Sequence, residues 1–510
     1  MYVVTGGEMH QIDRYTMDQL GLSEEILMEN AGQAFVRHLL TSVSIDEKVI
    51  VLIGAGNNGG DGFVISRLLA EKGFQFEIWV VPPVERVKGT ARFHMDIFKR
   101  CGYSFIEYEA NSIGFRESLN TCSVIIDALL GTGVKGNLRK PYAYVIKAVN
   151  ESEKRIISVD IPSGVPSSEG EAEVYGVIAN ETFTFQAPKL SAFVYPSALH
   201  FGEVHTLEIG IPKIAFTEVA PQRQLITEKR VRTTLAKRPA DAHKGKAGRA
   251  LIIGGTQEMT GAPVLTTDAC LRAGAGLATM AIPACIHPIV TQKLTESTFM
   301  KLPDAEGEIR SDVLKEEISY IQYDGIAIGP GMGRNISKPI YEALRSFNGP
   351  VVIDADGLYH MSNELHRWCE EPRSGPTIIT PHPGEMALLT GRTIKEVEEH
   401  RFEYTLDFAK KYQMYVVLKG PFTIVTTPVG EQWVNTTGNA SLAKGGSGDV
   451  LTGMILALVL QQHSVIDAIC NAVHIHGKLA DKMIETHDIF SVKASDLIHS
   501  LPRVLRSYRY

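Results

Sequence analysis

Short runs of apolar residues recur along the chain, and each is followed by a loop rich in glycine and polar residues. In the first half these runs cover residues 48–53, 76–81, 123–129 and 155–159. In the second half they cover residues 249–253, 278–282, 325–328, 351–353, 377–379 and 415–418. Uninterrupted apolar runs of this length are typical of strands buried on both faces of a parallel sheet. Stretches with helical spacing lie between them, so we predict an α/β protein with doubly wound sheets.

The strand-and-helix alternation occurs in two separate series. The first ends near Gly210, and the second opens at Arg249, with a mixed, polar-rich stretch between them. A chain of 510 residues is also too long for one hydrophobic core. We place the boundary near residues 215–228, with one three-layer αβα domain in residues 1–215 and another in residues 226–510.

The composition narrows the class of protein. A hydrophobic fraction of 44% is ordinary for a globular chain, and a net charge of −7 without a basic block argues against a nucleic-acid surface. The longest apolar run, residues 450–460, is too short to span a membrane, and the N-terminal residues lack a signal peptide. The six cysteines form no C-x-x-C pair and suit a reducing cytosol. We therefore expect a cytoplasmic protein that binds neither nucleic acid nor a membrane.

Three polar loops follow apolar runs of the first half. One spans residues 54–62 and leads into a helix predicted at 63–72, and the others begin at Asp127 and Asp160. Loops at the carboxyl ends of parallel strands meet at one edge of the sheet, so we expect them to converge on a ligand. The strand predicted at residues 76–81 lacks the terminal acidic residue that binds the ribose in ordinary NAD-dependent oxidoreductases, which disfavours a conventional hydride-transfer site. The alternative is that Asp127 or Asp160 merely caps a helix.

The second half is organised around residues 438–454, which read GNASLAKGGSGDVLTGM. Glycines at the start of an apolar helix present free amides that favour an anion. Asp449, in the first turn, could accept a proton from a hydroxyl that attacks a phosphate. The alternative is a plain helix with an acidic first turn. No P-loop motif occurs, so the chain is not a P-loop NTPase.

Histidines offer two further candidate sites. His382 follows a predicted strand and lies between two prolines. It either lines a site or lies in a surface loop. His474 and His476 are two residues apart on a predicted helix and therefore point apart, which excludes a shared zinc ion.

The first half resembles the NAD(P)H-hydrate epimerases. The resemblance is carried by MENAG at residues 28–32 and NNGGDG at residues 57–62, and it covers residues 8–212. It implies a Rossmann-like domain that interconverts the R and S hydrates of NADH and NADPH, called NADHX and NADPHX. It also implies that Asp160 is the acid/base and that K⁺ is held by Asn58, Asp127 and Ser163. The implied substrate residues are Asn57, Asn58, Gly59, Gly60, Asp61, Gly131, Thr132, Gly133, Val134, Lys135, Gly136, Asn137 and Asp160.

The second half resembles the ADP- or ATP-dependent NAD(P)H-hydrate dehydratases of the ribokinase-like superfamily. The resemblance covers residues 226–505 and is carried by HKG, GPGMG, DADG, TPHPGE, KGPFT and GGSGD. It implies a ribokinase-like domain that dehydrates the S hydrate with ADP and Mg²⁺, giving AMP and phosphate. Asp449 would be the base, and the hydrate would be lined by Ala262, Gly331, His382 and Asp449. The implied nucleotide residues are Lys419, Gly420, Pro421, Phe422, Thr423, Asn439, Gly445, Gly446, Ser447 and Gly448.

Two halves of this kind in one chain imply a bifunctional repair enzyme that acts on NADHX, NADPHX and ADP, and we expect a homo-oligomer. Spacing alone does not distinguish ADP from ATP. One alternative is a kinase that releases a phosphorylated metabolite. Another is that the first half is a binding module without catalytic activity.

Overall fold

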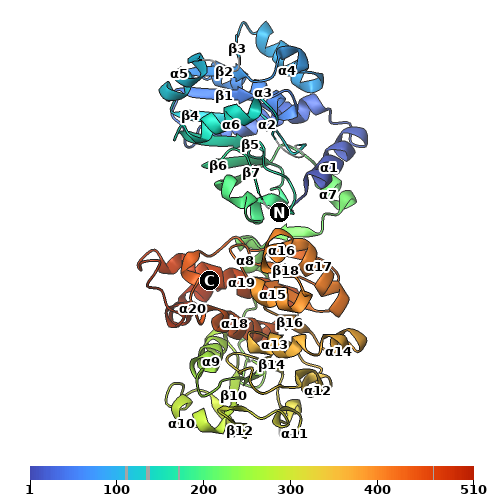
Figure 1. Cartoon of the computed structure of the whole chain (residues 1–510), viewed down its shortest axis with the longest axis vertical. Helices are drawn as coiled ribbons and strands as arrows, with labels where there is room; N and C mark the ends of the chain where they lie inside the picture. The colour runs from blue at the N-terminus through green and yellow to red at the C-terminus, as the bar shows by residue number, and fades with distance from the viewer. Residues whose placement is uncertain (109–112, 134–137, 171–172, 317, 463) are drawn as a thin grey trace. The chain divides into compact units, whose positions relative to one another are not determined.

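The computed structural model describes residues 1–108, 113–133, 138–170, 173–316, 318–462 and 464–510 (Figure 1). The chain divides into two compact units, Met1–Gln222 and Arg223–Tyr510. Among the described residues, no helix is both long and apolar enough to span a bilayer.

The first unit contains a parallel sheet. Within the described residues it has seven strands in the order β3-β2-β1-β4-β5-β6-β7. The strands are β1 (Val49–Ile53), β2 (Phe76–Val80), β3 (Ile106–Glu107), β4 (Val124–Ala128), β5 (Arg155–Val159), β6 (Glu181–Phe185) and β7 (Glu203–Leu207). The strand order reverses between β1 and β4, the point at which open α/β sheets bind ligands.

Helices cover both faces of this sheet. They are α1 (Gly6–Asp18), α2 (Glu24–Leu39), α3 (Asn57–Glu71), α4 (Gly89–Arg100), α5 (Ile113–Thr121), α6 (Tyr142–Asn150) and α7 (Lys213–Val219). Successive residues of β1 point to opposite faces: Val51 packs in the cluster that contains α2 and α3, whereas Leu52 packs with α5 and α6. The unit is therefore a three-layer αβα domain, as predicted.

The second unit has a larger sheet with one antiparallel edge. Its order is β11-β10-β9-β14-β15-β16-β17-β18-β19-β8 in the part of the unit that the structure describes. The strands are β8 (Arg223–Leu225), β9 (Arg249–Ile253), β10 (Leu277–Pro283), β11 (Thr298–Leu302), β14 (Gly325–Ile328), β15 (Val351–Ile353), β16 (Thr377–Ile379), β17 (Tyr415–Leu418), β18 (Ile424–Thr426) and β19 (Gln432–Val434). In this order, the neighbouring strands from β11 to β17 pair in parallel. Strand β18 is antiparallel to both β17 and β19, and β8 pairs in parallel with β19. A separate hairpin joins β12 (Asp304–Ala305) to β13 (Glu308–Ile309).

Two layers of helices enclose the parallel part of the sheet (Figure 1). One layer contains α8 (Glu228–Thr234), α9 (Gly261–Ala273), α18 (Ser447–Gln461), α19 (Val465–Met483) and α20 (Ala494–Arg509). The other contains α11 (Val313–Glu316), α12 (Ile340–Leu344), α13 (Asp356–Ser362), α14 (Leu365–Glu370), α15 (Pro383–Thr390), α16 (Ile394–Glu399) and α17 (Arg401–Tyr412). The short helix α10 (His287–Val290) packs in a satellite cluster with β10.

Helix starts differ most from the sequence-based expectation. Helix α3 begins at Asn57, not at Phe63, so the whole NNGGDG segment is helical. Its glycines predict a loop, but here they allow close packing at the helix start: a Cβ on Gly59 would lie 2.1 Å from the Gly54 carbonyl oxygen.

Two candidate active sites

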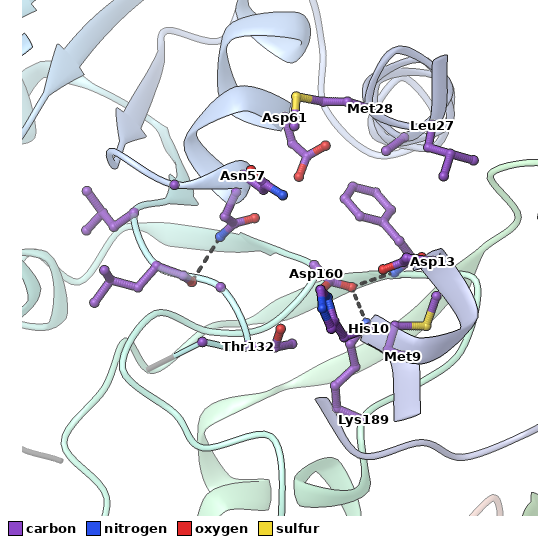
Figure 2. Close-up of a pocket in the computed structure, with 18 of the residues that line it drawn as sticks. Met9, His10, Asp13, Leu27, Met28, Asn57, Asp61, Thr132, Asp160 and Lys189 are labelled. Carbon is purple, nitrogen blue, oxygen red and sulfur yellow. Dashed lines mark hydrogen bonds and ion pairs between the residues drawn. The ribbon is translucent and has the colours of Figure 1, made fainter. Parts of the chain in front are cut away.

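A cavity of about 640 Å³ lies at the carboxyl ends of the strands of the first unit (Figure 2). It receives residues from α1, α2 and α3 and from the loops after β4 and β5. Seven residues of the predicted substrate site line it, namely Asn57, Asn58, Asp61, Gly131, Thr132, Gly133 and Asp160. The predicted residues Val134, Lys135, Gly136 and Asn137 lie outside the described residues. The expected convergence of the strand-end loops is therefore observed.

Two predicted substrate residues have a packing role in this unit. Gly59 is tightly opposed by Gly54, and a Cβ on Gly60 would lie 2.4 Å from the Met28 sulfur. Neither is among the residues that line the cavity. Because both residues lack a Cβ, α3 can approach the strand-end backbone and α2 closely.

Asp160 is held firmly at the cavity wall. Its Oδ1 accepts a hydrogen bond from the Phe185 amide (2.9 Å) and forms an ion pair with Lys189, whose ammonium is buried. Its backbone has a φ of +65°, a conformation that costs a non-glycine residue about 1–3 kcal/mol. Such local strain is often found at functional sites, where the surrounding structure fixes one side chain in a required direction.

Two more carboxyl groups face the same cavity. Burial, and secondarily the Asp160 carboxylate, raise the pKa of Asp61 well above its usual value. Burial raises the pKa of Asp13 to about 6, although the Lys189 ammonium opposes this shift. The sequence alone does not single out Asp13, because a lone aspartate on an amphipathic helix carries no motif. The cavity therefore combines an ion-paired aspartate with two aspartates whose pKa values are raised.

Of the three predicted cation ligands, Asn58 lines the cavity, whereas Asp127 and Ser163 are fully buried. The Asp127 carboxylate is fully buried and accepts hydrogen bonds from the Ser158 hydroxyl and the Ser163 amide, both at 2.9 Å. Asn58 donates to the Leu130 carbonyl (3.0 Å), and the Ser163 hydroxyl accepts from the Leu130 amide (2.8 Å). Among the described residues the buried Asn58 Oδ1 has no hydrogen-bond partner. An unpaired oxygen beside a carbonyl and a hydroxyl suits a hard cation.

The second candidate site forms where α18 begins. Gly446 is the N-cap residue, with a φ of +94°, and a Cβ there would approach Leu265 and Ala494 within 3 Å. Asp449 follows in the first helical turn. Burial, and next the neighbouring Asp354 carboxylate, raise the pKa of Asp449 to about 7, while Lys419 opposes the shift. A carboxyl group with this pKa can act as a base near neutral pH.

A buried charge network supports this helix start. The Lys419 ammonium lies 2.8 Å from Asp354 Oδ1 and 3.8 Å from Glu385 Oε2. The Thr452 hydroxyl donates to Asp354 Oδ2 at 2.6 Å. Lys419 was predicted to hold nucleotide, but its side chain is already paired with Asp354. Asp354 belongs to the DADG motif and Glu385 to the TPHPGE motif. The sequence predicts no role for either residue, because a motif does not show which side chains face each other.

Ala262 and Gly331 come together beside this network. Gly331 has a φ of +60°, and a Cβ there would lie 3.1 Å from the Ala262 Cβ and 2.9 Å from the Met259 Cβ. The glycine therefore allows the loop after β14 to contact the start of α9. His382 caps α15: its Nδ1 accepts from the Gly384 amide at 3.0 Å. The histidine is thus fixed at a helix start, with much of its ring exposed.

The predicted nucleotide loop, Lys419–Thr423, is held by an arginine that the sequence analysis did not identify. Arg401 is buried, and its Nη2 donates to the carbonyls of Lys419 and Phe422, each at 3.2 Å. The side chain of Asn439 is turned to Asp481 (3.1 Å) and to the Ser441 amide (3.1 Å). That of Ser447 donates to the Leu442 carbonyl (2.8 Å). Any ligand contact from Asn439 or Ser447 would therefore come from the backbone or require these bonds to change.

The two histidines of α19 have different surroundings. His474 Nε2 is hydrogen-bonded to the Tyr508 hydroxyl at 2.9 Å, and His476 is buried. In the described part of the chain, no group of three His, Cys, Asp or Glu side chains is arranged to hold a metal ion.

Fold and sites together define a two-unit α/β protein with polar clusters at the carboxyl ends of both sheets. A family model described as YjeF-related protein N-terminus matches residues 24–191, and one described as NAD(P)H-hydrate dehydratase matches residues 250–503. A bifunctional NAD(P)H-hydrate repair enzyme of Moorella thermoacetica is 34% identical, with 99% of this chain and 97% of the relative covered. One from Thermofilum pendens is 33% identical, with 100% and 97% covered. The chain belongs to the family of bifunctional NAD(P)H-hydrate repair enzymes.

A solved structure also resembles the chain. It is an ADP/ATP-dependent NAD(P)H-hydrate dehydratase from Bacillus subtilis co-crystallised with ATP and Mg²⁺, 33% identical, with a TM-score of 0.49. The match covers 56% of this chain and 98% of that one.

Proposed function

We propose that the second unit dehydrates S-NADHX and S-NADPHX with ADP and that the first unit interconverts the R and S epimers. The observation that carries the proposal is the partly buried Asp449, which has a pKa of about 7 at the glycine-rich start of α18. Hydroxide is a poor leaving group, so the C6 hydroxyl of the hydrate must be activated first. Family membership supplies the substrate class.

In the proposed dehydration, the Asp449 carboxylate accepts the proton of the C6 hydroxyl as its oxygen attacks the terminal phosphoryl group of ADP. AMP leaves, and the new phosphate ester then departs from C6 while C5 loses a proton, which restores the ring double bond. The amides of residues 445–448 stabilise the transferring phosphoryl group. Mg²⁺ accompanies the nucleotide and neutralises charge on its phosphates. Ala262, Gly331 and His382 line the hydrate, while residues 419–423 and Asn439 hold the nucleotide.

In the first unit the proposed acid/base is Asp160, fixed by Lys189 and the Phe185 amide. A monovalent cation, K⁺ by family resemblance, would bind Asn58, Asp127 and Ser163, and the unpaired Asn58 oxygen supports this. The cation would hold the loops after β1, β4 and β5 in place. We further propose that the enzyme is a cytoplasmic homo-oligomer.

The test is incubation of the full chain with both NADHX epimers, with ADP, with ATP, or without nucleotide. We expect nucleotide-dependent recovery of NADH absorbance with release of phosphate, and epimer equilibration without nucleotide. A stable phosphorylated product without NADH would instead indicate a kinase. If the epimers equilibrate no faster than in buffer, the first unit is a binding module.

A further inference from the structure

Asp61 differs from Asp160 in having no hydrogen-bond partner within the described residues, although it is only 9% exposed. Its side chain points from α3 into the cavity (Figure 2). Because the Asp61 carboxyl faces the cavity and no described protein group donates to it, a bound substrate can take the place of a protein partner.

Asp61 and Asp160 come from different walls of the cavity. Asp61 is carried by α3, which follows β1. Asp160 follows β5 and is paired with Lys189, and Val4 bridges to Lys189 just before α1 begins. Asp13, on α1, therefore belongs to the Lys189 side of the cavity, and the Lys189 ammonium lowers the pKa of Asp13 against the effect of burial.

This arrangement matches a requirement of inversion at one carbon. One epimer carries its C6 oxygen on one face of the ring, and the other epimer carries it on the opposite face. A single fixed carboxylate reaches one face unless the substrate turns over. Resting on the proposed epimerase function, we propose that Asp61 and Asp160 divide the proton transfers, one serving each face of C6.

In one direction, the Asp61 carboxylic acid donates its proton to the C6 hydroxyl, which leaves as water. The C6–O bond breaks, and the lone pair of the ring nitrogen forms an iminium bond to C6. A water molecule then adds to the other face, its oxygen bonds to C6, and its proton passes to the Asp160 carboxylate. The reverse reaction uses Asp160 as the acid and the Asp61 carboxylate as the base, so atoms and charge balance in both directions.

The electrostatics of the cavity support this assignment. Burial, Asp160, Asp13 and Glu24 all raise the pKa of Asp61, and only the Lys189 ammonium lowers it. These effects favour the protonated form of Asp61, and its place on the cavity wall lets it start the reaction as the acid. The ion pair with Lys189 keeps Asp160 as the acceptor.

The test compares the full chain with Asp61→Asn, Asp160→Asn and Asp13→Asn, without nucleotide so that no hydrate is dehydrated. Chiral chromatography gives the inversion rate, and equilibrium dialysis gives NADPHX binding. We expect Asp61→Asn and Asp160→Asn each to lose about 10²–10⁴-fold in inversion rate while still binding NADPHX. Asp13→Asn, which removes a carboxyl group from the Asp160 side, should lose much less. In ¹⁸O-water, each inversion by the wild type should place one solvent oxygen on C6.

Four results would overturn the assignment: wild-type inversion by Asp61→Asn, an equal loss in Asp13→Asn, loss of NADPHX binding that accounts for the slower inversion, or inversion without solvent oxygen. If the wild type itself does not accelerate inversion, the proposed epimerase function fails instead. The two failures are therefore distinguishable.

Discussion

The arginine behind the proposed nucleotide loop offers a sharp test of that site. Arg401 donates to two carbonyls of the loop, at Lys419 and Phe422, through one guanidinium nitrogen, and a Cβ on Gly420 would touch the same group. Arg401→Lys keeps the positive charge but removes the planar fork, so a single ammonium on a flexible stem replaces it. We expect the loop to lose at least one of its two anchors.

The expected magnitude follows from these bonds. A hydrogen bond from a charged donor contributes about 1.5–3 kcal/mol, so losing one lowers the equilibrium constant for forming the loop by about 10- to 100-fold. If nucleotide binds only the formed loop, the KM for ADP should rise by up to about the same factor. The KM for the hydrate should change little, because Ala262 and Gly331 are held by other contacts.

Arg373→Lys is a matched control. Arg373 also donates to backbone carbonyls, at Leu344 (3.0 Å) and Gly349 (2.9 Å), but these lie at the amino ends of the strands, away from Asp449. Steady-state kinetics with ADP and with hydrate, together with thermal unfolding, would be measured for both variants. We expect both to unfold at lower temperature and only Arg401→Lys to raise the KM for ADP. Equal KM values for the two variants would refute the placement of the nucleotide at residues 419–423.

Three further predictions address charged groups of both units. The dehydration rate should rise with pH through about 7 as Asp449 loses its proton. Asp354→Asn should move this rise to lower pH, because the Asp354 carboxylate raises the pKa of Asp449. A pH profile of kcat for both proteins checks these expectations. Asp449→Ala should lower dehydration by about 10²–10⁴-fold while the epimers still equilibrate, whereas Asp160→Ala should do the reverse, and a variant that loses both activities would contradict two independent sites. Glu308→Gln should destabilise the second unit by about 3–5 kcal/mol, because it leaves the buried Lys338 ammonium without its charge partner, which lies 2.8 Å away. Calorimetry that shows no shift in the unfolding of this unit would contradict the prediction.

The sequence predicted the parallel strands well, since apolar runs such as 325–328 and 415–418 coincide with β14 and β17. It did not predict the antiparallel edge, because β18, β19 and β8 are three residues long and have no distinct pattern. Motifs identified loops but not the pairing of their side chains, and so the Asp354–Lys419 pair emerged only from the structure. Arg401 and Asp13 lie outside any motif, and their roles depend on which backbone groups and charges meet them in space.

The edge strand β8 has a consequence for synthesis of the chain. Its residues, Arg223–Leu225, leave the ribosome early, but its partner β19 begins at Gln432, which is 432 − 225 = 207 residues later. At roughly 5–20 residues per second this is a delay of about 10–40 s. The described strands of the first unit are complete by Leu207, so that unit can fold before β19 has been synthesised. A nascent chain that stalls before Gln432 would therefore carry a finished first unit joined to an open-edged second one, and chaperones or proteases would act on the second.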